Sequence, residues 1–248
     1  MPVQSSAPPT QAVIFDGDDT LWLTEQLYDR ARLNARNIVV AAGLDGTRWE
    51  ARERQLDTEN VAKMGFGFER FPTSCVEAYE ELSRNMGFPV DPLVSQKVAQ
   101  AAASVFNWNP MIAVGAKEGL FNLRLCGFKL ALLTKGNPEL QSRRIESSGL
   151  KELFDVISIV AEKNPEVIKG LVRSLGVEIG SAWMVGNSAR SDILPALSVG
   201  MRAIWIETHV WEYERAFDHL LGPETLRAAN LSEAVQYIVN EESCLQEI

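Results

Sequence analysis

The chain has 248 residues, and its 24 lysines and arginines against 33 aspartates and glutamates give a formal net charge of −9. This acidic balance argues against a nucleic-acid-binding protein, which needs clustered cations to displace the counterions of the phosphate backbone. No apolar run approaches the roughly 18 residues that a membrane-spanning helix requires. With 46 % hydrophobic and 23 % charged residues, the chain suits one large globular domain with a smaller inserted one.

The first ten residues are rich in proline and serine and lack the basic and apolar segments of a secretion signal. We therefore expect residues 1–10 to form a flexible tail. The three cysteines, Cys75, Cys126 and Cys244, are far apart and have no metal-ligand spacing. They indicate free thiols in a reducing compartment, so we expect a cytoplasmic protein.

Short apolar runs without alternation predict buried strands, and each is bounded by Gly, Asp, Asn or Pro. They lie at residues 12–15, 129–134, 155–160, 182–185 and 202–206. Segments of helical period, such as 138–148 and 164–175, separate the later runs. Strands that alternate with helices predict an α/β fold, a doubly wound Rossmann-like parallel sheet covered on both faces.

The interval between the first strand and the second is too long for a single crossover helix. Most of it has helical periodicity, over residues 24–42, 47–64, 73–86 and 91–106. This predicts a helical cap domain of residues 23–107, inserted into a core formed by residues 11–22 and 108–248. A second domain in tandem is the alternative, but residues 11–22 would then be a strand without a sheet.

The sequence Asp16-Gly17-Asp18-Asp19-Thr20 directly follows the first predicted strand. Like charges brought together where water is limited raise one another's pKa or require a cation. Mg²⁺ takes oxygen ligands from one or two carboxylates plus a substrate phosphate, and would relieve this repulsion. The alternative is structural, because Asp and Thr commonly cap the first turn of a helix.

Polar residues also follow the later strands, and parallel strands bring their carboxyl ends to one edge of a sheet, where ligands bind. Thr134 ends the second predicted strand and Lys135 follows it. Lys163 follows the third strand at the start of a helix, where an anion would suit it. Residues 186–192 follow the fourth strand and include Asn187 and Asp192. Taken singly, these are also ordinary turn, surface and capping residues; their common position indicates a site for cleaving a phosphate ester.

These motifs, in this order, resemble those of the haloacid dehalogenase-like (HAD) hydrolase superfamily, most closely its phosphatases with a helical cap between the first and second motifs. The resemblance covers residues 11–208. It implies that Asp16 is the nucleophile, Asp18 the general acid/base and Thr134 a donor to a phosphate oxygen, and that Lys163 steadies both nucleophile and phosphoryl group. The expected phosphate-binding residues are Asp16, Thr134, Lys135 and Lys163, and the expected Mg²⁺ ligands are Asp16, Asp18, Asn187 and Asp192.

One position departs from the family pattern, because many relatives have Gly-Asp where this chain has Gly186-Asn187. An Asn ligates Mg²⁺ through its amide oxygen but brings no charge, so either Asn187 or Asp192 could be the direct ligand. The resemblance implies a Mg²⁺-dependent phosphatase that hydrolyses a small phosphorylated metabolite through an aspartyl-phosphate intermediate. The alternatives are a phosphomutase of the same superfamily and a catalytically weakened binding or regulatory protein.

Within the predicted cap, glycines and aromatic residues interrupt two helical stretches between Lys63 and Pro72. We expect this loop to face the site, with Lys63 or Arg70 in contact with a polar or anionic substrate. The alternative is an ordinary helix connection whose phenylalanines pack within the cap. No partner other than the substrate is expected, and the chain is expected to be a monomer or a homodimer.

Overall fold

The computed structural model describes residues 11–208 and 211–246, so the predicted tail at residues 1–10 lies outside the described residues. A six-stranded sheet has the strand order β5-β4-β1-β6-β7-β8, and every neighbouring pair is parallel. The doubly wound α/β fold predicted above is confirmed. The strands are β1 (Ala12–Phe15), β4 (Lys129–Lys135), β5 (Val156–Val160), β6 (Ala182–Gly186), β7 (Arg202–Ile206) and the unpredicted β8 (Leu226–Ala228).

Helices cover both faces of this sheet, as the uniformly apolar strands require. Val13 and Phe15 of β1 pack with apolar residues of α6 (Ala116–Leu125), α7 (Pro138–Ser148) and α11 (Leu231–Gln246). Ala12 and Ile14 point to the opposite face and pack with α8 (Pro165–Leu175) and α9 (Leu194–Ser198). All four β1 residues are fully buried, so β1 is the centre of the core.

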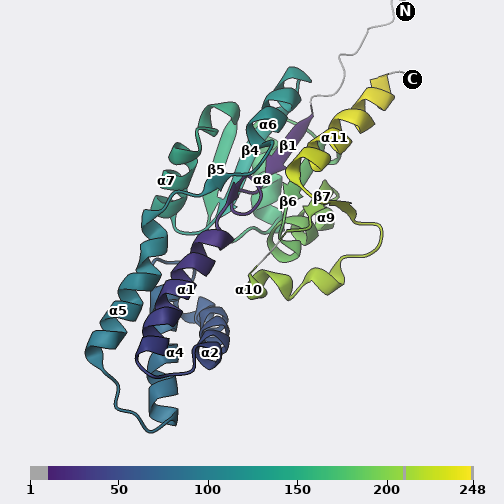
Figure 1. Ribbon diagram of the computed structural model, residues 1–248. Coiled ribbons are helices and arrows are strands. Elements are labelled where there is room, and N and C mark those ends of the chain that lie inside the picture. The colour runs from purple at the N-terminus through teal and green to yellow at the C-terminus, as the bar shows by residue number, and fades with distance from the viewer. Residues whose placement is uncertain (1–10, 209–210, 247–248) are drawn as a thin grey trace, which may run out of the picture.

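The long interval between β1 and β4 forms a helical insertion with a hydrophobic cluster of its own, which includes Ala31, Trp49 and Phe71. Figure 1 shows these helices beyond the carboxyl ends of the strands, while α11 lies beside the sheet, away from the insertion. The insertion consists of α1 (Glu25–Ala41), α2 (Gly46–Glu59), α3 (Val61–Met64), α4 (Arg70–Asn85), α5 (Pro92–Ala103) and the 3₁₀ helix η1 (Ser104–Asn107).

A two-stranded antiparallel ribbon joins the insertion to the sheet. The chain leaves through β2 (Trp22–Leu23) and returns through β3 (Met111–Ile112), which pair directly. The backbone N–H of Ala113 also donates to the carbonyl of Leu21 at 2.9 Å. Because the exit and the return are hydrogen-bonded neighbours, more than eighty residues are inserted here without disturbing the order of the parallel sheet.

Two helix predictions in the insertion were wrong in their bounds. The expected helix at 47–64 is interrupted at Asn60, whose amide donates to the Ser74 hydroxyl at 3.1 Å and to a Glu77 carboxylate oxygen at 2.8 Å. These bonds tie the break to α4. The expected helix at 73–86 begins earlier, at Arg70, because Pro72 lies in its first turn, where no intrahelical N–H is needed.

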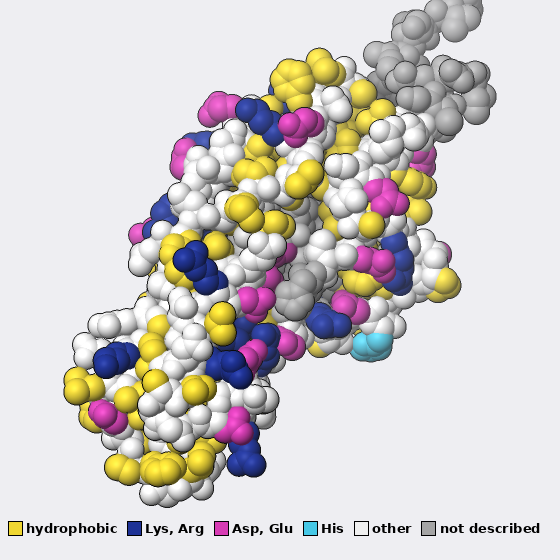
Figure 2. All heavy atoms as spheres, viewed as in Figure 1, with side chains coloured by type: hydrophobic (Ala, Val, Ile, Leu, Met, Phe, Trp, Pro, Cys, Tyr) yellow, Lys and Arg dark blue, Asp and Glu magenta, His cyan; other side chains and the backbone are white. Residues whose placement is uncertain are grey.

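Charged side chains of both signs gather along the junction between the insertion and the sheet domain, as the dark blue and magenta spheres in Figure 2 show. Within the part of the chain that the structure describes, no helix combines the length and the apolar character that crossing a bilayer requires. The charged junction is the candidate region for a functional site.

Candidate active site

The ends of four parallel strands bring the predicted residues to one edge of the sheet. Asp16 follows β1, Thr134 is the penultimate residue of β4, Lys163 follows β5, and Asn187 follows β6. β1 lies between β4 and β6, so the strand order reverses beside Asp16. Ligands bind at such reversal points in open α/β sheets.

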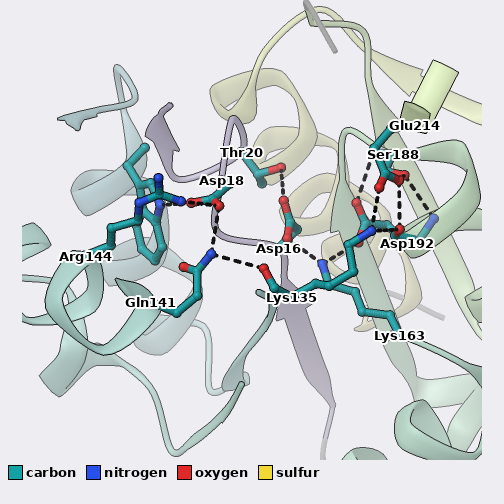
Figure 3. Close-up of polar contacts among 12 residues, drawn as sticks. Asp16, Asp18, Thr20, Lys135, Gln141, Arg144, Lys163, Ser188, Asp192 and Glu214 are labelled. Atoms are coloured by element: carbon teal, nitrogen blue, oxygen red, sulfur yellow. Dashed lines mark hydrogen bonds and ion pairs between the residues drawn. The ribbon is translucent and has the colours of Figure 1, made fainter. Parts of the chain in front are cut away.

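Lys163 lies between two carboxylates, as the dashed lines in Figure 3 show. Its ammonium donates to Asp16 Oδ1 and, at 2.6 Å, to Asp192 Oδ1. All three side chains are buried: the residues are 5 %, 6 % and 0 % exposed for Lys163, Asp16 and Asp192. A buried ammonium shared by two acids from different loops fixes the relative positions of β1, β5 and β6 at this edge.

Burial and the neighbouring opposite charge shift the pKa values of Asp16 and Lys163 in opposite directions. Burial raises the pKa of Asp16 to about 7, although the neighbouring Lys163 ammonium acts to lower it. Burial acts to lower the pKa of Lys163, but the carboxylates of Asp16 and Asp192 raise it above its ordinary value. Lys163 therefore remains a cation at neutral pH, and a further cation near Asp16 would favour the ionised carboxylate.

The loop after β6 orients Asp192 toward Lys163. Asp192 Oδ2 accepts from the backbone N–H of Ser188 at 3.0 Å, so both oxygens of this carboxylate have partners. A Cβ added to Gly186 would lie 2.3 Å from Asp192 Oδ2, which explains the glycine that ends β6. Asp192 is thus an ion-pair partner of Lys163, and the neighbouring Asn187 has an amide side chain without a hydrogen bond to another described residue.

Asp18 points to the other side of the site, toward α7 and β2. Its carboxylate accepts from Arg144 Nη1 at 2.6 Å and Gln141 Nε2 at 2.8 Å. The indole N–H of Trp22 donates to its other oxygen at 2.6 Å. All three partners donate, so together they fix the direction in which the Asp18 carboxylate points.

Sequence reasoning did not find Arg144 or Gln141. The signal was present, because both polar residues lie on the buried face of α7 beside Leu140 and Ile145. A buried arginine three residues from a buried glutamine, on an otherwise apolar face, needs an acidic partner.

Asp19 caps a helix. This is the role that the alternative interpretation assigned to the whole acidic segment at residues 16–20. Its carboxylate accepts from the backbone N–H groups of Thr24 at 2.8 Å and Glu25 at 3.0 Å, and also from the Thr24 hydroxyl. It therefore caps the first turn of α1. Its φ of 58° is a left-handed conformation that Asp tolerates better than most residues.

Thr134 presents an unpaired donor beside the Asp16–Lys163 pair. Its hydroxyl is buried and has no hydrogen-bond partner among the described residues. A Cβ on Gly17 would lie 3.2 Å from this hydroxyl and 2.5 Å from the Trp22 ring, so the glycine keeps the space open. A buried hydroxyl without a partner suits a ligand oxygen such as that of a phosphate.

Lys135, the next residue, lines the same cavity, and neighbouring side chains hold its ammonium. It bonds to the Ser191 hydroxyl at 2.7 Å and to a carboxylate oxygen of Glu214, and it lies 4.5 Å from the centre of the Phe66 ring. Its charge thus borders the predicted phosphate position.

A cavity of about 140 Å³ lies between the strand ends and the insertion. Its wall on the sheet side includes Asp16, Thr134 and Lys163, and its wall on the insertion side is formed by Tyr28, Arg32, Asp57, Phe66, Arg70 and Phe106. A small ligand in this cavity would contact both parts of the molecule.

The two basic residues predicted to contact substrate lie in different places. Arg70 lines the cavity, where it pairs with Asp57 and stacks over the Trp211 ring at 4.3 Å, and its Nε has no hydrogen-bond partner among the described residues. Lys63 is exposed, bonds to Asn60 Oδ1 at 3.1 Å and does not line the cavity. The geometry supports Arg70 and not Lys63 as a substrate contact.

The donor set suits a hard cation that is completed by substrate. Within residues 11–208 and 211–246, no group of three or more His, Cys, Asp or Glu side chains is arranged to hold a metal ion. Among the four expected ligands, Asp16 Oδ2 has the Thr20 hydroxyl as its partner at 3.2 Å, and Asn187 lines the same cavity. Mg²⁺ commonly keeps waters and uses one or two protein ligands plus phosphate oxygens, so these residues fit it.

Comparison with known proteins agrees with this geometry. A family model described as haloacid dehalogenase-like hydrolase matches residues 10–200. The chain is 29 % identical over 203 residues to a glyceraldehyde 3-phosphate phosphatase of Pyrococcus abyssi, covering 79 % of this chain and 81 % of that protein. It is 27 % identical over 220 residues to the protein of the same name from Methanothermobacter thermautotrophicus, covering 85 % and 90 %.

A solved haloacid dehalogenase-like family hydrolase from Xanthomonas campestris has the same fold. It superposes with a TM-score of 0.76 at 23 % identity and covers 98 % of this chain and 100 % of that one. The insertion and the sheet are thus both matched by a known structure.

We predict that the free energy of unfolding of the metal-free wild-type protein falls relative to that of the Asp16→Asn variant as the pH rises. The Asp16 carboxyl binds its proton more tightly in the folded chain, where its pKa is about 7, than at the ordinary value of 3.8. The stabilisation that the protonated carboxyl contributes is therefore complete below pH 3.8. It is lost as the pH rises through about 7, the pKa of Asp16 in the folded chain. Urea unfolding at stepped pH measures this difference. A wild-type protein that gains stability over the variant with rising pH would contradict the account.

Proposed function

This chain belongs to the haloacid dehalogenase-like hydrolase family, and we propose that it is a Mg²⁺-dependent phosphatase that hydrolyses a small phosphorylated metabolite through an aspartyl-phosphate intermediate. The observation that supports this most strongly is the Lys163 ammonium shared by Asp16 and Asp192, beside the unpaired Thr134 hydroxyl. A carboxylate, an ammonium and a hydroxyl donor around one cavity suit the attack on a phosphorus atom and the binding of its oxygens.

In the first step, a carboxylate oxygen of Asp16 bonds to phosphorus while the bond from phosphorus to the ester oxygen breaks. Asp18 lines the same cavity; in the proposed step it enters as the protonated acid, donates that proton to the departing alkoxide and is left as a carboxylate. In the second step, Asp18 removes a proton from water, which attacks the aspartyl phosphate and releases inorganic phosphate. Arg144 and Gln141 fix the direction of Asp18 for both transfers.

Charge on the transferred phosphoryl group spreads over its three equatorial oxygens, so catalysis depends on donors that are already in position. Lys163 and Thr134 supply them from the ends of neighbouring strands. Lys135 adds positive charge beside the cavity. Because Lys163 is held by two carboxylates, it needs no rearrangement to meet the developing charge.

Asp16 and Asn187 are the proposed Mg²⁺ ligands. The ion would screen the repulsion between the nucleophile and the phosphate and would gather phosphate oxygens. Asp192 and Asp18, which were also expected to bind Mg²⁺, have carboxylates held by protein donors. We assign Asp192 to holding Lys163 and Asp18 to proton transfer. With an uncharged Asn187, the affinity for Mg²⁺ should be lower than in relatives with Asp there.

Residues 23–107 are proposed to act as a cap domain that covers the cavity, excludes water and contacts the leaving group. Two similar proteins are named glyceraldehyde 3-phosphate phosphatases, so a three-carbon sugar phosphate is the first substrate to test. Cys75 and Cys126 are free thiols, which agrees with a proposed cytoplasmic location.

With Mg²⁺, the wild-type protein should release inorganic phosphate from glyceraldehyde 3-phosphate and from p-nitrophenyl phosphate, and EDTA should abolish the release. Asp16→Asn should lower kcat by a thousandfold or more, a factor on the order of those seen when a nucleophile is removed. Asp19→Asn is the matched control, because the amide still caps α1, and it should keep most of the activity. Equal loss in the two variants would contradict the assignment. Isomerised substrate without free phosphate would indicate a mutase.

Arg70 should determine how well the enzyme distinguishes polar from apolar leaving groups, because its unpaired Nε borders the cavity. For Arg70→Gln, the ratio of kcat/KM for glyceraldehyde 3-phosphate to that for n-propyl phosphate should fall by about tenfold, as expected for a lost hydrogen bond. Lys63→Gln is the control, because Lys63 lies in the same segment between two helical stretches but outside the cavity, and it should leave the ratio unchanged. An unchanged ratio in Arg70→Gln would show that the arginine serves only the packing of the insertion.

A further inference from the structure

Glu214 is a buried carboxylate near the site that the mechanism above does not use. It lies in α10 (Glu212–Arg215), a short helix after β7, and its side chain is 12 % exposed. One of its oxygens accepts from Lys135 Nζ. The other accepts from the hydroxyls of Ser188 at 2.5 Å and Ser191 at 2.8 Å.

These three donors come from two different segments of the site, and Figure 3 shows two of them, Lys135 and Ser188, beside Glu214. Lys135 directly follows Thr134 at the end of β4. Ser188 and Ser191 lie after β6, between Asn187 and Asp192: Ser188 precedes the short π-helix η4 (Ala189–Ile193), and Ser191 lies within it. One carboxylate therefore joins the loop with the phosphate-binding hydroxyl to the loop with the proposed metal ligand.

The two serines transmit this connection to Asp192. The backbone N–H of Ser191 donates to Ser188 Oγ at 2.9 Å, and the backbone N–H of Ser188 donates to Asp192 Oδ2 at 3.0 Å. Asp192 in turn holds Lys163. Glu214 is thus connected to Asp192 by two hydrogen bonds and to Lys163 by a third, and it bonds directly to Lys135.

Glu214 remains ionised in this setting. Burial acts to raise its pKa, but the Lys135 ammonium and the two serine hydroxyls lower it below the ordinary value. A buried, ionised carboxylate with three donors has a fixed position, so it can in turn fix the groups that bind it.

We propose that Glu214 is a positioning residue that holds the Lys135 ammonium and the Ser188–Asp192 loop at the phosphate site. This inference rests on the proposed function, in which the cavity binds a phosphoryl group. Without the carboxylate, the lysine has no anionic partner there and can adopt other rotamers, and both serine hydroxyls lose their acceptor. Phosphate binding should weaken even though Glu214 touches no substrate atom.

The same short helix also contacts the insertion. Trp211, just before α10, stacks under Arg70 at 4.3 Å, and Tyr213 packs edge-to-face with Phe66 at 5.9 Å between ring centres. Glu212 pairs with Arg54 of α2 at 3.1 Å. Glu212 therefore provides a control carboxylate on the same helix that faces the insertion instead of the catalytic loops.

The test is the dissociation constant of inorganic phosphate, measured by calorimetry with Mg²⁺ present, because it needs no turnover. Glu214→Gln should weaken binding on the order of tenfold, as for a lost hydrogen bond to a charged group. Glu212→Gln should bind as the wild type does. The double variant Glu214→Gln, Lys135→Gln should bind more tightly than the product of the two single losses predicts, because both changes remove the same interaction.

An unchanged dissociation constant in Glu214→Gln, or losses that simply multiply in the double variant, would overturn the proposal. Urea unfolding of each variant separates a loss of binding from a loss of folding. If Glu214→Gln does not fold, Ser191→Ala with Lys135→Gln forms an equivalent cycle, since Ser191 bonds to both partners. A wild-type protein that binds phosphate but hydrolyses no ester contradicts the proposed function alone. One that binds no phosphate overturns this proposal as well.

Discussion

The arrangement of this site depends on one buried cation, the Lys163 ammonium, between the carboxylates of Asp16 and Asp192. Removing one member of such a buried group is strongly destabilising, by roughly 3–5 kcal/mol, because it leaves an uncompensated charge. This buried ion-pair group also constrains the residues around it. Asp192 requires glycine at position 186, and its other oxygen orders the Ser188 backbone, which sets the position of the loop after β6. Three strand ends are thereby held at the point where the strand order reverses.

Three neighbouring acids in the first motif have three different environments and hence different roles. Asp16 faces Lys163, Asp18 faces the donors of α7, and Asp19 faces the first turn of α1. The turn that separates them is stabilised by backbone bonds to the carbonyl of Gly17, including one from Leu21 at 2.8 Å. A sharp reversal after β1 distributes like charges to separate partners, which is how a crowded acidic segment remains compatible with folding.

Much of this could be predicted from the sequence, for identifiable reasons. Continuous apolar runs marked five of the six strands of the sheet with small errors in their bounds but missed β8. Polar residues after successive strands indicated the edge at which Asp16, Thr134 and Lys163 meet. The sequence could not separate Asp19 from its acidic neighbours, because a capping residue and a nucleophile are both acids after a strand. β2 and β3 have two residues each, too few for a periodic signal. Arg144 and Glu214 act from helices, where only tertiary packing shows which group a buried charge meets.

The most direct test of the central claim is to trap the covalent intermediate on the residue that Lys163 holds. The enzyme is quenched in acid during turnover of p-nitrophenyl phosphate, reduced with borohydride, which converts an aspartyl phosphate to homoserine, and mapped by mass spectrometry. The account predicts homoserine at position 16, with none at positions 18 or 19 and none in the absence of substrate. Homoserine at another aspartate, or unmodified Asp16 in enzyme quenched while it is releasing phosphate, would contradict it.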